Sequence, residues 1–180
     1  RMRITSAGNL GIGTSSPSAQ LHIVGSATTN QVKIENTDGG AASAPDLVLF
    51  RNSASPADND ALGRIHLRGK TDTGAENNYA YMYATSADVS NGNESGNLFI
   101  GGLINGADRS WLSLKEYEVA VNDDSNDMDF RVESNANTHA LFVQASDGAV
   151  HIGTSTNGSA GAGDLVVNGG VFLGGTDTAH

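Results

Sequence analysis

Short apolar runs that alternate with polar residues recur along most of the chain, and this pattern predicts β-strands. An alternation of period two sends successive side chains to opposite faces of a strand. No window combines the 3.6-residue apolar period of a helix with capping residues. We therefore predict an all-β chain with strands at 2–5, 10–12, 21–25, 32–34, 47–50, 65–67, 79–84, 98–100, 111–114, 117–121, 128–133, 141–143, 150–152, 165–169 and 171–173.

Glycine preceded by asparagine or aspartate separates many of these runs. Such pairs readily adopt the positive φ that tight hairpins need. They predict short strands joined by Gly/Asn turns at Asp38-Gly39-Gly40, Asn91-Gly92, Asn105-Gly106, Asp147-Gly148 and Asn157-Gly158.

The chain also contains an internal repeat. Residues 8–15 read GNLGIGTS and residues 148–155 read GAVHIGTS, and a strand is predicted before and after each copy. Glycines in such short strands let backbones approach closely, so three copies of the chain could pack near one axis. The positions to which we assign this structural role are Gly8, Gly11, Ile12, Gly13, Gly148, Ile152 and Gly153. The expected organisation is a Gly-rich module at 1–25, a β domain at 26–138 and a second Gly-rich module at 139–180.

Composition and charge exclude several classes of protein. The chain has 180 residues, and 10 Lys and Arg against 20 Asp and Glu give a formal net charge of -10. This balance argues against nucleic-acid binding and against docking on an anionic membrane. No apolar run approaches the roughly 20 residues of a membrane span, so we expect no membrane insertion. Because the chain has no cysteine, disulfides, zinc–thiolate sites and thiol nucleophiles are excluded, and no cofactor is expected.

The apolar content is low for a chain of this length. Hydrophobic residues make up 38% and aromatic residues 6% of the sequence, whereas glycine is abundant, with 23 residues. A thin core suggests that apolar surface is buried between chains.

Three segments carry a resemblance to a known family. They are residues 1–17 (RMRITSAGNLGIGTSSP), 51–60 (RNSASPADND) and 122–134 (NDDSNDMDFRVES), the last followed by THALFV at 138–143. The first resembles the recurring GNxGIGTxxP module of phage tail fibres and related virion structural proteins, especially from marine phages, and the others are similar to segments of the same family. The sequence departs from the module at His151, where glycine is usual, and Pro17 has no counterpart in the second copy.

The resemblance implies a rigid, intertwined homotrimer in the virion, outside the cell. Its expected role is structural and non-catalytic, in host attachment, with other virion fibre or baseplate proteins as partners. The alternatives are a glycan-binding adhesin, a capsid or neck decoration module, and a polysaccharide lyase or hydrolase. A bacterial surface fibre built from the same modules also remains open.

Polar-tipped aromatic residues form one candidate binding site. Tyr79, Tyr81, Tyr83 and Trp111 could stack on the sugar rings of a host surface glycan. The alternative is a cross-strand aromatic ladder that stabilises the sheet.

Acidic residues form a candidate metal site. Asp123, Asp127 and Asp129 could bind Ca²⁺, which prefers oxygen ligands. An EF-hand loop would need glycine where Met128 stands and glutamate where Ser134 stands, so a polar turn entering a strand is the favoured interpretation.

Two histidines lie within apolar strands. Three copies of His22 or of His151 could meet on a threefold axis and hold a metal or an anion, although such residues more often pack or form hydrogen bonds.

Overall fold

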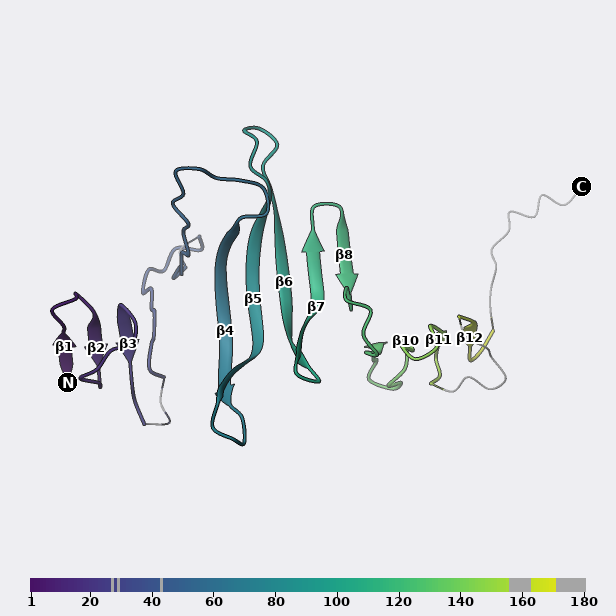
Figure 1. Cartoon of the computed structure of the whole chain (residues 1–180). Helices are drawn as coiled ribbons and strands as arrows, with labels where there is room; N and C mark the ends of the chain where they lie inside the picture. The colour runs from purple at the N-terminus through teal and green to yellow at the C-terminus, as the bar shows by residue number, and fades with distance from the viewer. Residues whose placement is uncertain (27, 29, 43, 156–162, 171–180) are drawn as a thin grey trace, which may run out of the picture. The chain divides into compact units, whose positions relative to one another are not determined.

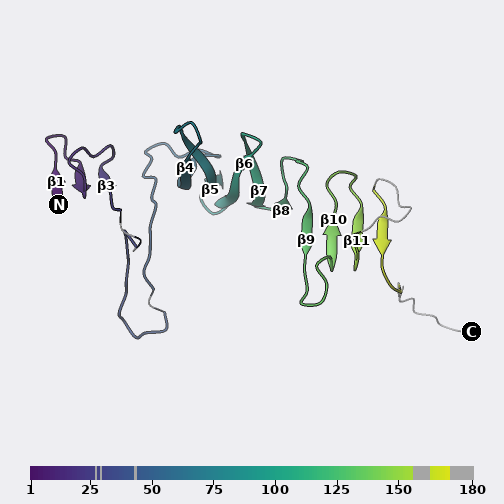
Figure 2. The same ribbon diagram turned by 90° about the horizontal axis from the view of Figure 1, so that it is seen from below.

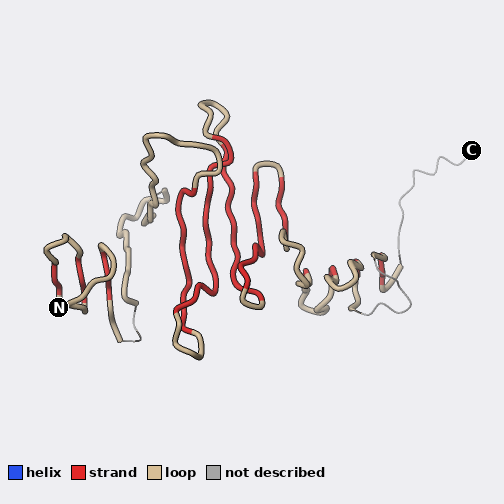
Figure 3. The backbone as a smooth tube through the Cα atoms, in the orientation of Figure 1, coloured by secondary structure: helices blue, strands red, loops and turns tan. Residues whose placement is uncertain are grey.

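The structure is a computed structural model that describes residues 1–26, 28, 30–42, 44–155 and 163–170. Within these ranges all regular structure is β, and the strands form three sheets without a helix (Figure 3). The all-β prediction is therefore confirmed. The chain divides into two compact units, Arg1–Val48 and Leu49–His180.

The first unit contains a three-stranded sheet. Its strands are β1 (Met2–Ile4), β2 (Leu10–Ile12) and β3 (Leu21–Ile23). The pair β1–β2 is antiparallel, whereas β2–β3 is parallel.

The second unit contains an antiparallel meander of five strands (Figures 1 and 2). These are β4 (Ala61–Lys70), β5 (Glu76–Asp88), β6 (Ser95–Ile104), β7 (Ala107–Lys115) and β8 (Glu118–Val121). Asn105 and Gly106, with φ of 51° and 78°, form the two-residue turn between β6 and β7, and Gly92, with φ of 89°, lies between β5 and β6. Both turns were predicted from their Asn-Gly pairs.

The second unit also contains a four-stranded sheet in the order β12-β11-β10-β9. Its strands are β9 (Phe130–Val132), β10 (Leu141–Val143), β11 (Val150–Ile152) and β12 (Leu165–Val167). Strand β10 is antiparallel to β9 and β11, and β11 is parallel to β12.

The two repeats in the sequence have the same backbone arrangement. In both, an antiparallel pair is followed by a parallel third strand, with equivalent register. The amide of Gly13 donates to the carbonyl of Arg1 at 2.8 Å, and the amide of Gly153 donates to that of Ala140 at 3.3 Å. These two glycines have nearly equal φ, 76° and 78°.

The positive φ of the first glycine also recurs: it is 82° at Gly8 and 72° at Gly148. In both copies this glycine lies in the turn of the antiparallel pair. A side chain with a Cβ is strained at such a φ, which explains why both copies keep glycine there.

The chain's own loop closes over one face of the first repeat. A Cβ at Gly11 would lie 2.7 Å from the carbonyl oxygen of Thr14 and 3.6 Å from Cβ of Pro17. A Cβ at Gly13 would overlap the carbonyl oxygen of Val24. The close approach at these glycines is therefore made within one chain, and it does not need three chains at an axis.

The apolar core of the described residues is small. Of the residues that the structure describes, only Phe142, at 7% exposure, and Ala149, at 0%, are buried hydrophobic residues. They lie at the second repeat with His151, which is also fully buried and has its ring 5.4 Å from that of Phe142.

Two strand predictions are wrong. Residues 32–34 and 47–50 have no strand partner, and their apolar side chains are exposed, for example Val32 at 62% and Phe50 at 79%. The predicted turn at Asp38-Gly39-Gly40 accordingly joins no strands. The predictions at Asn157-Gly158 and 171–173 lie outside the described residues.

The RNSASPADND segment ends in a turn that is fixed to β5. Arg51 forms an ion pair with Asp60 at 2.8 Å. The hydroxyl of Ser86 donates to the carbonyl of Ala57 at 2.9 Å and accepts from the amide of Asp60 at 3.1 Å. Ser86 is only 5% exposed, so this buried hydroxyl anchors the start of the five-stranded sheet.

Candidate functional site

Two of the four predicted aromatic residues form a cluster on one face of the five-stranded sheet. Tyr83 lies directly opposite Arg64 on β4 and Phe99 on β6. Its ring stacks on that of Phe99 with centroids 4.6 Å apart, and the Arg64 guanidinium carbon lies 5.3 Å from its centroid. The ring of Tyr81 is 5.7 Å away from that of Tyr83. These contacts are those of a cross-strand aromatic ladder.

The ladder borders a shallow pocket of about 210 Å³. Its lining residues are Arg64, His66, Asn78, Tyr81, Tyr83 and Asp108. They offer ring faces, a guanidinium, an amide, an imidazole and a carboxylate, which together can bind a hydroxyl-rich ligand.

The hydroxyl of Tyr81 is held as a hydrogen-bond donor. It donates to the carbonyl of Arg109 across a long 3.5 Å separation. Burial, followed by the negative charge of Asp108, raises the pKa of the Tyr81 phenol above its ordinary value. The phenol therefore stays protonated at neutral pH. Beside it, His66 Nδ1 and the side-chain oxygen of Asn78 are 2.9 Å apart.

Trp111 lies on the opposite face from Tyr81. A Cβ at Gly101 would come within 2.8 Å of the Tyr81 hydroxyl, whereas a Cβ at Gly102 would come within 2.6 Å of the Trp111 ring. Adjacent residues of a strand point to opposite faces, so the two aromatic rings cover the two faces of this glycine pair.

Tyr79 also lies apart from the cluster. Register shifts in the pairing of β4 with β5 and of β6 with β7 leave Tyr79 and Trp111 without a directly opposite partner. The ring of Tyr79 packs at Gly69, where a Cβ would be 3.2 Å from it, and its hydroxyl donates to the carbonyl of Lys70 at 3.2 Å. The structure thus brings Tyr81 and Tyr83 together and separates Tyr79 and Trp111 from them.

The acidic segment after β8 serves as a set of hydrogen-bond acceptors. Asp123 pairs with Lys115 at 2.8 Å and accepts from the hydroxyl of the buried Ser113 at 3.0 Å. The neighbouring Asp124 accepts from the amide of Ser110 at 2.6 Å. The hydrogen bond to Lys115, followed by that to Ser113, lowers the pKa of Asp123.

The predicted metal ligands are not gathered into one cluster. Asp129 accepts from the amide of Ala145 at 2.9 Å, whereas Asp123 is bound to β7. Asp127 is the third predicted ligand, and among the described residues no group of three or more His, Asp or Glu side chains is placed to hold a metal ion.

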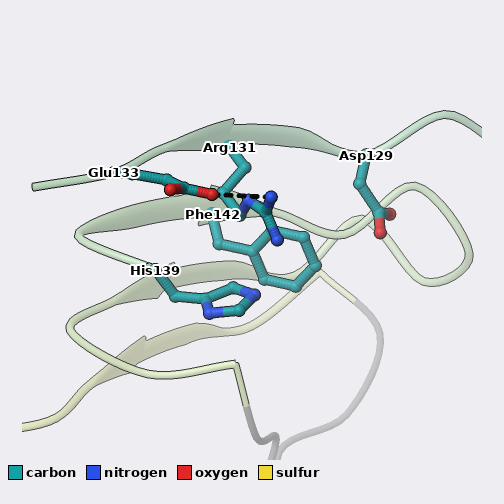
Figure 4. A pocket seen from close by; sticks show the side chains of 5 residues that line it. All are labelled: Asp129, Arg131, Glu133, His139 and Phe142. Carbon is teal, nitrogen blue, oxygen red and sulfur yellow. Dashed lines mark ion pairs between the residues drawn. The ribbon is translucent and has the colours of Figure 1, made fainter. Parts of the chain in front are cut away.

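A second pocket of about 570 Å³ lies at the four-stranded sheet (Figure 4). Apart from Asp129, none of its lining residues was predicted from the sequence to belong to a site. It is lined by Asp129, Arg131, Glu133, His139 and Phe142. Arg131 and Glu133 form an ion pair at 2.6 Å, and the ring of His139 meets that of Phe142 edge-on with centroids 5.0 Å apart. The charged residues Asp129, Arg131 and Glu133 alternate along and beside β9, and this alternation is the sequence feature that could have indicated the pocket.

The two strand histidines have different surroundings. His22 Nδ1 lies 3.2 Å from the amide of Ser18, from which it can accept a hydrogen bond. His151 is fully buried, and no described residue forms a hydrogen bond with either of its ring nitrogens.

No family model and no curated protein matches the chain. Among the described residues, none forms a helix with the length and apolar character to cross a membrane.

Proposed function

We propose that this chain is a non-catalytic structural component of a phage tail fibre or a similar virion appendage, and that it supports host attachment as a homotrimer. The observation that supports the proposal most strongly is the small apolar core of the described residues. Phe142 and Ala149 are the only buried hydrophobic residues in the described part of a 180-residue chain. Such a chain gains much of its stability by burying apolar surface against other copies.

The sequence supports a location on the virion. Three segments resemble tail-fibre proteins, and the two Gly-rich repeats share one backbone arrangement. A net charge of -10 per chain helps to keep an extended appendage soluble. The partners expected on the particle are other fibre or baseplate proteins.

The first test is the absolute mass in solution by light scattering, with and without mild denaturant. A resistant species of about 55 kDa, three times the chain mass of 18.5 kDa, is expected. A folded species of 18.5 kDa would overturn the proposal. Gold-labelled antibody on intact virions then separates a tail fibre from a capsid or neck decoration.

A second candidate function is glycan binding, which the pocket beside Tyr81 and Tyr83 favours. Tyr81→Ala and Tyr83→Ala should then abolish binding to host cells while the oligomer mass is unchanged. Tyr79→Ala is the matched control, since Tyr79 packs at Gly69 outside the pocket. Equal binding by all three variants would exclude this site. A reducing-sugar assay on host polysaccharide should show no release of product.

A further inference from the structure

Each of the three sheets has one face made of apolar side chains. Directly paired residues share a face, so the register defines rows of neighbours across each sheet. In the first unit the rows are Met2–Ile12–Ile23 and Ile4–Leu10–Leu21. In the four-stranded sheet they are Val132–Leu141–Ile152–Val167 and Phe130–Val143–Val150–Leu165. In the five-stranded sheet they are Ile65–Met82–Ile100–Leu112–Val121 and Gly63–Ala84–Leu98–Leu114–Val119.

None of the side chains in these rows is buried. In the first unit Met2 is 73% and Ile4 68% exposed. In the four-stranded sheet Leu165 is 65% exposed, and in the five-stranded sheet Val119 is 69% exposed. These sheets therefore present an apolar surface that is largely open, although the side chain of Leu49 lies against it at Gly63.

The opposite faces of the two repeats are already covered from within the chain. At the first repeat, the loop that contains Thr14 and Pro17 closes over Gly11. At the second repeat, His139 packs on Phe142, and His151 is fully buried. The chain's own residues thus take up part of each of these faces, and the pocket at Arg131 and Phe142 lies on one of them.

We propose that the apolar face of each sheet packs against the same face of the same sheet in other copies of this chain, with the opposite face of each sheet outward. This inference rests on the proposed function, and it specifies the surface through which the homotrimer forms. It also places the pocket at Arg131 and Phe142 on the outside of the assembly, since these residues alternate with those of the apolar rows.

The area available is sufficient for a stable interface. Fourteen residues of these rows are each at least 36% exposed. Together they offer on the order of 1,000 Å² of surface per chain, whereas a stable complex buries roughly 800 Å² on each partner. At about 25 cal/mol per Å², this burial is the main driving force for assembly.

The sheet widths indicate which faces meet. The sheets have three, four and five strands. A face of three strands set against one of five would leave two strands uncovered, whereas copies of one sheet match in width. Each face is therefore best covered by its own counterpart in another copy.

Because the chain has no cysteine, single introduced cysteines can map this interface, and no native thiol reacts with the cross-linker. Ile152→Cys and Ile12→Cys place a thiol on an apolar face of the second and first repeat. Val166→Cys and His22→Cys are the matched controls, since each lies on the opposite face of the same sheet. The purified variants are treated with a short bis-maleimide and analysed on denaturing gels.

We expect covalent dimers from the two apolar-face variants and roughly tenfold fewer from the controls, because bound copies hold the thiols at high effective concentration. Each chain carries one thiol, so a homotrimer yields linked pairs and a single chain. If Ile152→Cys lowers the far-UV circular dichroism signal, Val150→Cys replaces it on the same face.

The cross-linking results and the mass in solution together distinguish a failure of this inference from a failure of the proposed function. If the mass is that of three chains but the control positions cross-link instead, the face assignment is overturned and the trimer stands. If the mass is that of one chain, the proposed function fails as well. If a tagged Ile12→Cys chain, mixed and refolded with Ile152→Cys, links mainly to that chain, then unlike sheets pair and the same-sheet arrangement is refuted.

Discussion

Two glycines of β6 should respond in opposite ways to alanine, because their surroundings differ. A Cβ at Gly101 would overlap the carbonyl oxygen of Arg109 and lie 2.8 Å from the Tyr81 hydroxyl. A Cβ at Gly96 would have one neighbour, the carbonyl oxygen of Thr85 at 3.5 Å, which is an ordinary contact. Neither glycine adopts a positive φ. The comparison therefore isolates the cost of steric overlap.

The expected magnitudes follow from two effects. Replacing a strand glycine with alanine restricts the unfolded chain and stabilises the fold by about 0.5–1 kcal/mol. Overpacking a filled site costs about 1–3 kcal/mol. The free energy of unfolding should thus rise by about 0.5–1 kcal/mol in Gly96→Ala and fall by about 1–2 kcal/mol in Gly101→Ala. For a chain of 180 residues, 1 kcal/mol corresponds to roughly 2–4 °C in Tm.

Denaturant unfolding followed by tryptophan fluorescence measures these changes. Trp111 is the single tryptophan, and it lies on the face opposite Tyr81, so Gly101→Ala does not alter its contacts directly. All variants are compared at one chain concentration, since association adds to the apparent stability. The reasoning is refuted if Gly101→Ala is as stable as Gly96→Ala.

Further predictions concern polar groups. Asp123→Asn should destabilise the fold above pH 4, and the difference from the unmodified chain should disappear in acid, because the lowered pKa of Asp123 contributes stability only while the carboxylate is ionised. Lys115→Met should lose the same ion pair, and pH-dependent thermal unfolding measures both. Ser86→Ala should cost about 1 kcal/mol and speed proteolysis at residues 57–60, since it removes the hydrogen bonds by which the Ser86 hydroxyl holds the backbone of Ala57 and Asp60. His151→Leu should raise the free energy of unfolding by about 1–2 kcal/mol by removing buried nitrogens that have no partner among the described residues, and an unchanged or lower value in calorimetry would contradict this.

The sequence predicted the repeats because their pairing is local. In residues 1–25 the strands and the glycine turns lie close together, so alternation and turn residues determine which segments pair. The same reasoning failed at 32–34 and 47–50. Their alternation or apolar run is genuine, but a strand needs a hydrogen-bonded neighbour, and a pattern within one segment does not reveal whether one exists.

The placement of the aromatic residues was predicted only in part, because β-bulges change which face a residue occupies. A strict period of two would place Tyr79 with Tyr81 and Tyr83 on one face. The register shift beside Tyr79 turns its ring to the other face, where it packs at Gly69. Such a shift depends on the pairing of two strands, so no alternation within one strand could indicate it.

The acidic segment shows a related limit. From the sequence alone its carboxylates were possible metal ligands, because the sequence does not show which groups contact them. In the structure Asp123 is bound by Lys115 and Ser113, from a strand that precedes it by several residues. The interpretation as a polar turn therefore agrees better with the contacts than the metal site does.

The equivalence of the two repeats has a consequence for how the gene can change length. Residues 12–15 and 152–155 both read IGTS, and both follow the antiparallel pair of their repeat. Unequal recombination between the DNA segments that encode residues 12–15 and 152–155 would delete the sequence between them. The antiparallel pair β1–β2 would then be followed directly by the region that contains β12. The product would keep one complete repeat with its glycines in place, and the reciprocal event would insert another five-stranded sheet. Descendants of this gene could thus lengthen or shorten in whole structural units without passing through an unpaired strand.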